Sequence, residues 1–224
     1  MKKKKENNLI KNLIIFTFAI MVLMVPAKVA QASTKSDAEN VLKYYQEGNI
    51  SKAKKYNKNL AKNPSKTCIK KLSKKAKAAY KKVVKKYKIE FSSNKEYLWG
   101  YYLVDMNGDK KAELLVQHGT CEADVRTTIY TYKGGKAKKI AETFSGHTGY
   151  CAYPGHSGVI CVWGHMGYES VSTMVIKDGK IETKSYGGRD LNKSGDWFPF
   201  KQVLYNHIEY DENYNRYVDW KDLQ

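Results

Sequence analysis

YLWGYYLVDMNGDKKAELLVQHG, residues 97–119, is the stretch that decides the fold, because two apolar runs enclose a short polar loop. The runs Tyr97–Val104 and Leu114–Gly119 are rich in aromatic and aliphatic residues, which is typical of β-strands. Asn107 and Gly108 in the loop favour a tight reversal of the chain. The stretch therefore predicts two antiparallel strands joined by a polar turn.

Two further pairs of alternating segments follow this stretch. Each pair is joined by a lysine-flanked turn that contains glycine, and glycine supplies the positive φ that tight hairpins need. These pairs are residues 125–144, with Lys-Gly-Gly-Lys at 133–136, and residues 171–186, with Lys-Asp-Gly-Lys at 177–180. We therefore expect a series of short antiparallel strands.

The segment before the strands has the pattern of helices. Between Cys68 and Tyr87 the apolar residues recur at helical spacing, and lysines fill most of the other positions. A shorter helix is expected from about Ile50 to Leu60 on the same grounds. In the C-terminal tail, residues 201–210 are the best candidate for another helix.

These patterns predict an α+β fold, in which lysine-rich N-terminal helices precede an antiparallel β-meander of partial-propeller type. The expected organisation is a signal peptide (1–32), a lysine-rich helical region (33–90), an antiparallel β domain with the polar loop (91–190) and a tail with some helix (191–224).

The first residues have the three parts of a secretory signal peptide. Lysines at positions 2–5 and 11 form a basic region, an apolar run covers Leu13–Val25, and Ala30-x-Ala32 offers a cleavage site before Ser33. The apolar run is shorter than the ~20 residues of a membrane-spanning helix. We expect a secreted protein, released or retained at the cell wall, and an uncleaved anchor is the alternative.

Positive charge is concentrated in one part of the chain. Residues 35–90 contain 18 lysines and no arginine against four acidic residues, whereas residues 91–224 are close to neutral. Such a block attracts polyanions through a field that salt screens. Because arginine forks are absent from it, specific nucleic-acid recognition is not expected. An anionic cell-wall polymer or a membrane surface is the expected partner; a solvated surface without a partner is the alternative, and no protein partner is indicated.

The polar loop between the first two strands carries oxygen atoms at alternate positions. A tightly curled loop of this kind, closed by a carboxylate, suits a hard cation that takes six to eight oxygen ligands. The candidate ligands are the side chains of Asp105, Asn107, Asp109 and Glu113 and the carbonyl of Lys111. An acidic turn that holds no ion is the alternative.

Residues 97–182 also resemble the Asp-x-Asn-Gly-Asp loops of FG-GAP and VCBS-type β-repeat proteins, and the single-copy versions of such loops in secreted Gram-positive β-domain proteins. The resemblance implies Ca²⁺ ligation by Asp105, Asn107, Asp109, the Lys111 carbonyl and Glu113. Two departures from the pattern imply weak affinity. Lys110 replaces the usual glycine, and Glu113 replaces the commoner aspartate.

The four cysteines, Cys68, Cys121, Cys151 and Cys161, allow three disulfide pairings in a secreted protein. Cys151 and Cys161 are equidistant from His156, so a hairpin centred there would place them opposite each other. Cys68 would then pair with Cys121. Free buried thiols are the alternative.

Three Gly-His-x-Gly units, with His147, His156 and His165 nine residues apart, lie around these cysteines. In a meander, successive turns fall at opposite ends of the sheet, so we expect His156 to lie far from His147 and His165, whereas these two could approach each other but would supply only two ligands. The glycines favour turns over a zinc site. The sequence favours a non-catalytic secreted binding protein; a Cys/His or zinc-dependent cell-wall hydrolase and a factor binding a host or neighbouring-cell protein are the alternatives.

Overall fold

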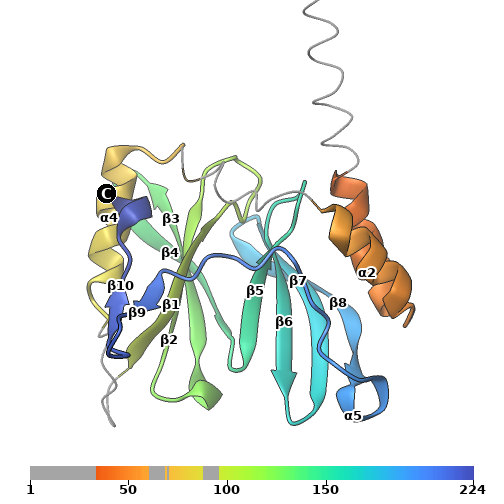
Figure 1. The fold of residues 1–224 in the computed structure, drawn as a ribbon. Coiled ribbons are helices and arrows are strands. Elements are labelled where there is room, and N and C mark those ends of the chain that lie inside the picture. The colour runs from red at the N-terminus through yellow and green to blue at the C-terminus, as the bar shows by residue number, and fades with distance from the viewer. Residues whose placement is uncertain (1–33, 61–68, 70, 88–95) are drawn as a thin grey trace, which may run out of the picture.

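Ten strands form two four-stranded antiparallel sheets and one two-stranded ribbon in the computed structural model, which describes residues 34–60, 69, 71–87 and 96–224 (Figure 1). The first sheet consists of β1 (Tyr97–Val104), β2 (Glu113–Gly119), β3 (Arg126–Lys133) and β4 (Lys136–Phe144). The second consists of β5 (Thr148–Ala152), β6 (Val159–His165), β7 (Tyr168–Lys177) and β8 (Lys180–Asp190). Both sheets have their strands in chain order, so each is a meander.

The hairpin turns have the geometry that their glycines predict. Gly134 and Gly135 join β3 to β4 with φ of 61° and 78°, and Asp178 and Gly179 join β7 to β8 with φ of 49° and 74°. Positive φ at both central residues matches the right-handed twist of the flanking strands. The prediction of antiparallel hairpins at these two turns is confirmed.

The two sheets pack face to face around a shared apolar core. Alternate residues of β1 lie on opposite faces, so Tyr102 and Val104 point toward the second sheet while Tyr101 and Leu103 point away from it. Met174 and Ile176 of β7, in the second sheet, pack in the same core cluster as Tyr102 and Val104. Because both faces of β2 are covered, every residue of that strand is buried.

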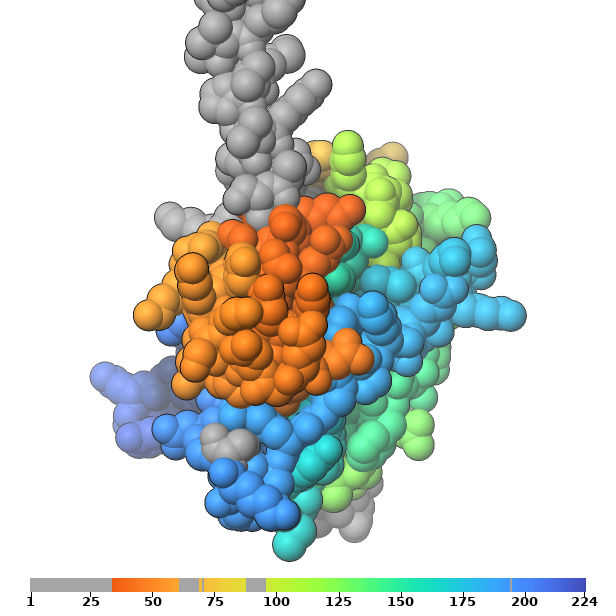
Figure 2. Space-filling view, turned by 90° about the vertical axis from the view of Figure 1, so that its right-hand side faces the viewer, coloured from red at the N-terminus to blue at the C-terminus, as the bar shows by residue number. Residues whose placement is uncertain are grey.

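A helical layer covers the outer face of each sheet. Helix α4 (Lys74–Val84) begins at Ser73, whose side chain accepts a hydrogen bond from the Ala76 N–H, and it packs on the first sheet. The helix of residues 34–46 and α2 (Ile50–Asn59) pack on the second sheet. The order of layers is therefore helix, sheet, sheet, helix (Figure 1). Figure 2 shows residues 34–60 lying side by side over the second sheet.

The lysine-rich region thus contributes helices to two different faces. The helix predicted over 50–60 is present as Ile50–Asn59, and the helix predicted over 68–87 is present only as the shorter Lys74–Val84, because the chain at 71–73 is not helical. They lie at opposite ends of the molecule, so the lysines of α2 and those of α4 do not share one surface (Figure 1). None of the described helices is both long and apolar enough to cross a bilayer. The predicted signal peptide lies outside the described residues.

The C-terminal segment differs from the prediction. Residues 201–210 are not helical; they run as an extended segment whose end is β9 (Ile208–Tyr210), paired with β10 (Arg216–Val218). The helix in this tail is α5 (Leu191–Ser194), and short 3₁₀ turns η1 (Glu122–Asp124) and η2 (Lys221–Leu223) complete the elements. The apolar side chains here pack on both sheets instead of forming a helical stripe: Phe198 and Phe200 on the second, Ile208 and Leu223 on the first.

The α+β class and the antiparallel sheets are confirmed. Among the described residues, the sheets are two layers of one sandwich and do not close into a barrel or a propeller ring.

Candidate metal centre and basic surfaces

The loop between β1 and β2 folds around the Asp105 carboxylate. One oxygen of Asp105 accepts hydrogen bonds from the Asn107 and Gly108 N–H groups at 3.3 and 2.7 Å, and the other accepts from Lys110 N–H at 2.8 Å. Asn107 and Asp109 repeat the pattern, because each side-chain oxygen accepts a hydrogen bond from the N–H two residues later. These consecutive turns place polar oxygens at alternate positions of a tightly curled chain.

Lys110 occupies the position where calcium loops prefer glycine, and its φ is 64°. This is the left-handed region, which costs a lysine of the order of 1 kcal/mol. The unusual backbone turn that the pattern implies at this position is therefore present, although the residue that makes it is not glycine.

Glu113 closes the loop from a buried position, with a relative exposure of 1%. Its carboxylate accepts hydrogen bonds from Met106 N–H at 2.9 Å, Thr131 Oγ1 at 3.0 Å and Asn107 Nδ2 at 3.3 Å. Burial raises the pKa of Glu113 to about 7 against the lowering effect of the first two of these hydrogen bonds, and the nearby Asp109 carboxylate also raises it. No cation among the described residues pairs with this carboxylate.

Three of the five predicted ligands, Asp109, Lys111 and Glu113, line one cavity of about 300 Å³ between the loop and α4. Tyr80 of α4 fixes this side of the loop by donating a hydrogen bond to the Ala112 carbonyl at 3.0 Å. Within the described residues, however, no three carboxylate, imidazole or thiol groups converge as a metal cluster. A cation here would need the Asn107 amide oxygen and the Lys111 carbonyl in addition to the carboxylates.

The loop is also tied to the second sheet. Gly158 N–H, in the β5–β6 turn, donates to the Asp105 carbonyl at 2.7 Å, and Ile176 N–H in β7 donates to the Met106 carbonyl at 2.8 Å. The Met106 side chain is fully buried in the core between the sheets. A change in the loop is therefore transmitted directly to the packing of the two sheets.

The three histidines are arranged as the meander predicts. His147 and His165 stack with ring centroids 4.1 Å apart, and His147 Nδ1 lies 3.1 Å from a Glu122 carboxylate oxygen. His156 lies in the opposite turn, where it stacks on Tyr153 at 3.9 Å and its Nε2 lies 3.3 Å from a Glu39 carboxylate oxygen. The expected separation of His156 is confirmed, and His147 and His165 do approach each other.

The cysteines differ from the symmetric pairing. The β5–β6 register pairs Ala152 with Val159, so Cys151 lies opposite Ile160 and Cys161 lies opposite Tyr150. This is one residue away from the register in which the cysteines would face each other, and it places them on opposite faces of the sheet. Cys121, Cys151 and Cys161 are free thiols, and Cys68 lies outside the described residues.

Burial makes the two strand thiols poor nucleophiles. It raises the pKa of both Cys151 and Cys161 to about 12, and the Ser172 hydrogen bond lowers the pKa of Cys161 only in part. A thiol with a raised pKa is protonated at neutral pH and unreactive. The geometry therefore gives no support to either residue as the nucleophile of a hydrolase.

These thiols lead to a labelling prediction. In the native protein at pH 8 without reductant, iodoacetamide should modify exposed Cys121 while Cys151 and Cys161 stay unmodified, and guanidinium alone should make both accessible. Mass spectrometry of the proteolytic peptides measures each site. If Cys151 and Cys161 were labelled in guanidinium only after reduction, they would be disulfide-bonded and the register described here would be contradicted.

The basic side chains form two separate surfaces. On α2, Lys54, Lys55 and Lys58 are exposed, and on α4 Lys74, Lys75, Lys82 and their neighbours are exposed. No ion pair involves the lysines of these two helices within the described part of the chain. Their charge is therefore available to an anionic partner.

A buried polar centre around Glu169 could not be recognised from the sequence. The fully buried Glu169 carboxylate pairs with Arg189 Nε, accepts a hydrogen bond from Tyr45 Oη at 3.0 Å and accepts another from Phe198 N–H at 3.1 Å. These partners are 20, 124 and 29 residues away from it in sequence, so no local spacing could identify the group. The centre joins the N-terminal helix, β7, β8 and the C-terminal segment, which indicates a structural role.

Comparison with known proteins adds no assignment to this geometry. The chain matches no family model, no curated protein and no solved structure.

Proposed function

We propose that the protein is a secreted, non-catalytic binding protein, organised around a structural Ca²⁺ in the β1–β2 loop and using its lysine-rich helices to contact anionic cell-surface polymers. The observation that carries the calcium part is the buried Glu113 carboxylate, which has hydrogen-bond donors but no cationic partner among the described residues. A buried carboxylate without a counter-charge is costly, and a divalent ion would offset that cost.

The ligand set of this proposal is Asp105, Asn107, Asp109, the Lys111 carbonyl and Glu113. The Asp105, Asn107 and Asp109 oxygens already lie in consecutive turns of one loop, so little chain entropy would remain to be lost on binding. The strained backbone at Lys110 and the missing cluster of three charged ligands favour millimolar over micromolar affinity. A site of that affinity would be occupied only at extracellular calcium concentrations, in agreement with the proposed secretion.

The polymer-binding part rests on the unpaired lysines of α2 and α4. Lysine without arginine supplies point charges, which bind a polyanion without reading its detailed geometry. Binding of this kind releases counterions and so weakens steeply as salt rises.

A salt titration tests the polymer-binding part. The chain from Ser33 onward should bind poly(glycerol phosphate) at about 50 mM salt, and the affinity should fall by at least about tenfold at 200 mM salt. Fluorescence anisotropy with an end-labelled polymer measures both values. Absence of binding at the lower salt would contradict this part of the proposal.

A further inference from the structure

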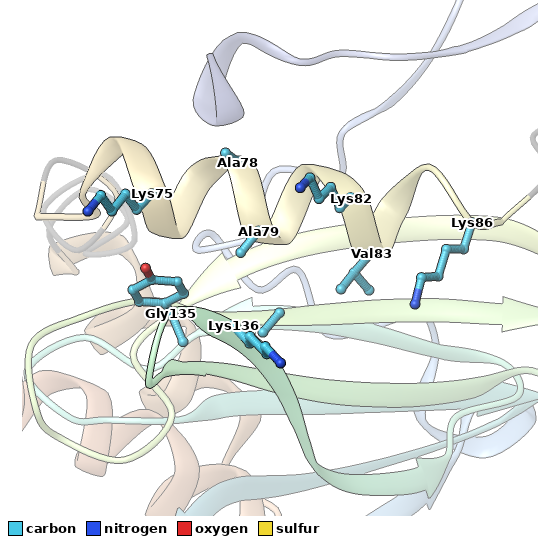
Figure 3. A pocket seen from close by; sticks show the side chains of 10 residues that line it. Lys75, Ala78, Ala79, Lys82, Val83, Lys86, Gly135 and Lys136 are labelled. Carbon is cyan, nitrogen blue, oxygen red and sulfur yellow. The ribbon is translucent and has the colours of Figure 1, made fainter.

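A groove of about 640 Å³ runs between α4 and the β3–β4 hairpin (Figure 3). Lys75, Lys82 and Lys86 line it from the helical side, and Lys136 lines it from the start of β4. Figure 3 shows Lys75 and Lys82 on the helix, Lys86 just beyond it and Lys136 on the hairpin opposite. The hairpin that faces the helix lies far from Lys75–Lys86 in sequence, so the sequence pattern alone gives no indication of the groove.

The lining of the groove carries charge of one sign. No carboxylate lines it, and within the described residues none of the four lysines takes part in an ion pair. This differs from Lys139, two residues from the groove-lining Ala137, which pairs with Glu142 at 2.7 Å. The four unpaired ammonium groups repel one another, and an anionic ligand would relieve that repulsion.

The positions of the lysines suit an extended ligand. Lys75 and Lys82 are seven residues apart in α4, so they lie along one side of the helix about 10 Å apart, and Lys86 follows two residues after the end of the helix. A single small anion could not reach all of them. A chain that carries an anion at every repeat could contact the row one charge after another.

The floor of the groove is apolar, with Ala79 and Val83 from α4 and Ala137 from β4. Such a floor suits the carbon backbone of a polyol, whereas base stacking requires a series of aromatic rings, and Tyr132 is the one aromatic residue that lines the groove. A planar membrane surface cannot follow a concave groove between two elements. Charge and shape together favour a linear phosphodiester polymer without bases.

We propose that this groove is the binding site for a base-free phosphodiester polymer of the poly(glycerol phosphate) class, which would run along α4 between Lys75 and Lys86 and contact Lys136 from the other side. The inference rests on the polymer-binding part of the proposed function and deepens it, because it assigns recognition to the α4 side and not to α2, which is also basic.

Two variants of equal net charge test the assignment. Lys82→Gln/Lys86→Gln/Lys136→Gln removes three charges from the groove, and Lys54→Gln/Lys55→Gln/Lys58→Gln removes three exposed charges from α2, at the other end of the molecule. At about 50 mM salt the groove variant should bind poly(glycerol phosphate) at least about tenfold more weakly than wild type, and the α2 variant less than about threefold. The charge-retaining Lys82→Arg/Lys86→Arg variant should bind within about twofold of wild type.

The outcomes separate the inference from the proposal on which it rests. If wild type does not bind the polymer, the proposed function fails and the groove assignment fails with it. If wild type binds and the two triple variants weaken equally, polymer binding stands and the groove assignment is overturned. Oligo-dT of the same charge is the second ligand, and tighter binding of oligo-dT than of the polymer would overturn the base-free assignment. The melting temperature of each variant, measured by thermal unfolding, checks that the variant is folded.

Discussion

Replacing Glu169 with alanine is expected to destabilise the protein by about 3–5 kcal/mol, because it leaves the Arg189 guanidinium without its buried partner. The Glu169 side chain is fully buried and the Arg189 side chain has a relative exposure of 12%. The same substitution removes the acceptor of the Tyr45 hydroxyl and the Phe198 N–H. The helix of residues 34–46 and the C-terminal segment should therefore loosen from the second sheet.

Urea denaturation followed by tryptophan fluorescence measures the effect. Tyr45→Phe removes one hydrogen bond from the same centre and should cost about 1 kcal/mol. Glu182→Ala, on the exposed side of β8, is the matched control and should change stability by less than about 0.5 kcal/mol. A loss below about 1 kcal/mol for Glu169→Ala would show that the centre is not a structural link.

Calcium should stabilise the wild-type protein and leave an Asp105→Asn/Asp109→Asn variant unaffected. Asparagine removes two negative charges and keeps one acceptor oxygen at each position. That oxygen preserves the bond from Lys111 N–H at position 109 and the bonds from Asn107 and Gly108 N–H at position 105, while the bond from Lys110 N–H is lost. At ten times the dissociation constant, the bound ion should contribute about 1.4 kcal/mol, or a rise of about 3–6 °C in the melting temperature. Differential scanning calorimetry in calcium and in EDTA measures this difference.

The control for this variant removes the same charge elsewhere. Asp178→Asn/Glu182→Gln lies in and beside the β7–β8 turn and should keep the full response to calcium. Equal responses of the two variants would indicate nonspecific screening of charge. A calcium response retained by the Asp105/Asp109 variant would contradict the loop as the site.

Local patterns in the sequence predict the elements of this fold well. The strands β1 and β2 follow from the runs on either side of residues 105–112. The turns at Gly134–Gly135 and Asp178–Gly179 follow from their glycines, which readily adopt the positive φ found there. Helix α4 follows from its apolar spacing. In each case the residues that determine the element lie next to one another in the chain, so local chemistry is sufficient.

Features that depend on distant contacts could not be predicted in the same way. The β5–β6 register is one residue away from the symmetric hairpin, and this single step separates Cys151 from Cys161. Residues 201–210 contain apolar side chains without a regular period, because they pack against different layers of the sandwich. The division of the lysine-rich helices between two sheets likewise depends on which apolar face each helix covers.

The candidate site shows the same division. Asp105, Asn107 and Asp109 are identifiable from spacing alone, since their turns are local. The burial of Glu113 and its bond from Thr131 depend on β3, which lies beyond the loop in the sequence. The basic groove proposed as a binding site depends on Lys136 and α4 lining the same space, and that arrangement exists only in the folded protein.

Isothermal titration of calcium into the chain from Ser33 onward tests the central claim, that the β1–β2 loop is an ion site, most directly. We predict saturable binding of one ion per chain, with a dissociation constant of about 0.1–1 mM, which the Asp105→Asn/Asp109→Asn variant loses. Absence of binding up to about 10 mM calcium, far above that range, would contradict the claim and leave the loop as an acidic turn between two strands.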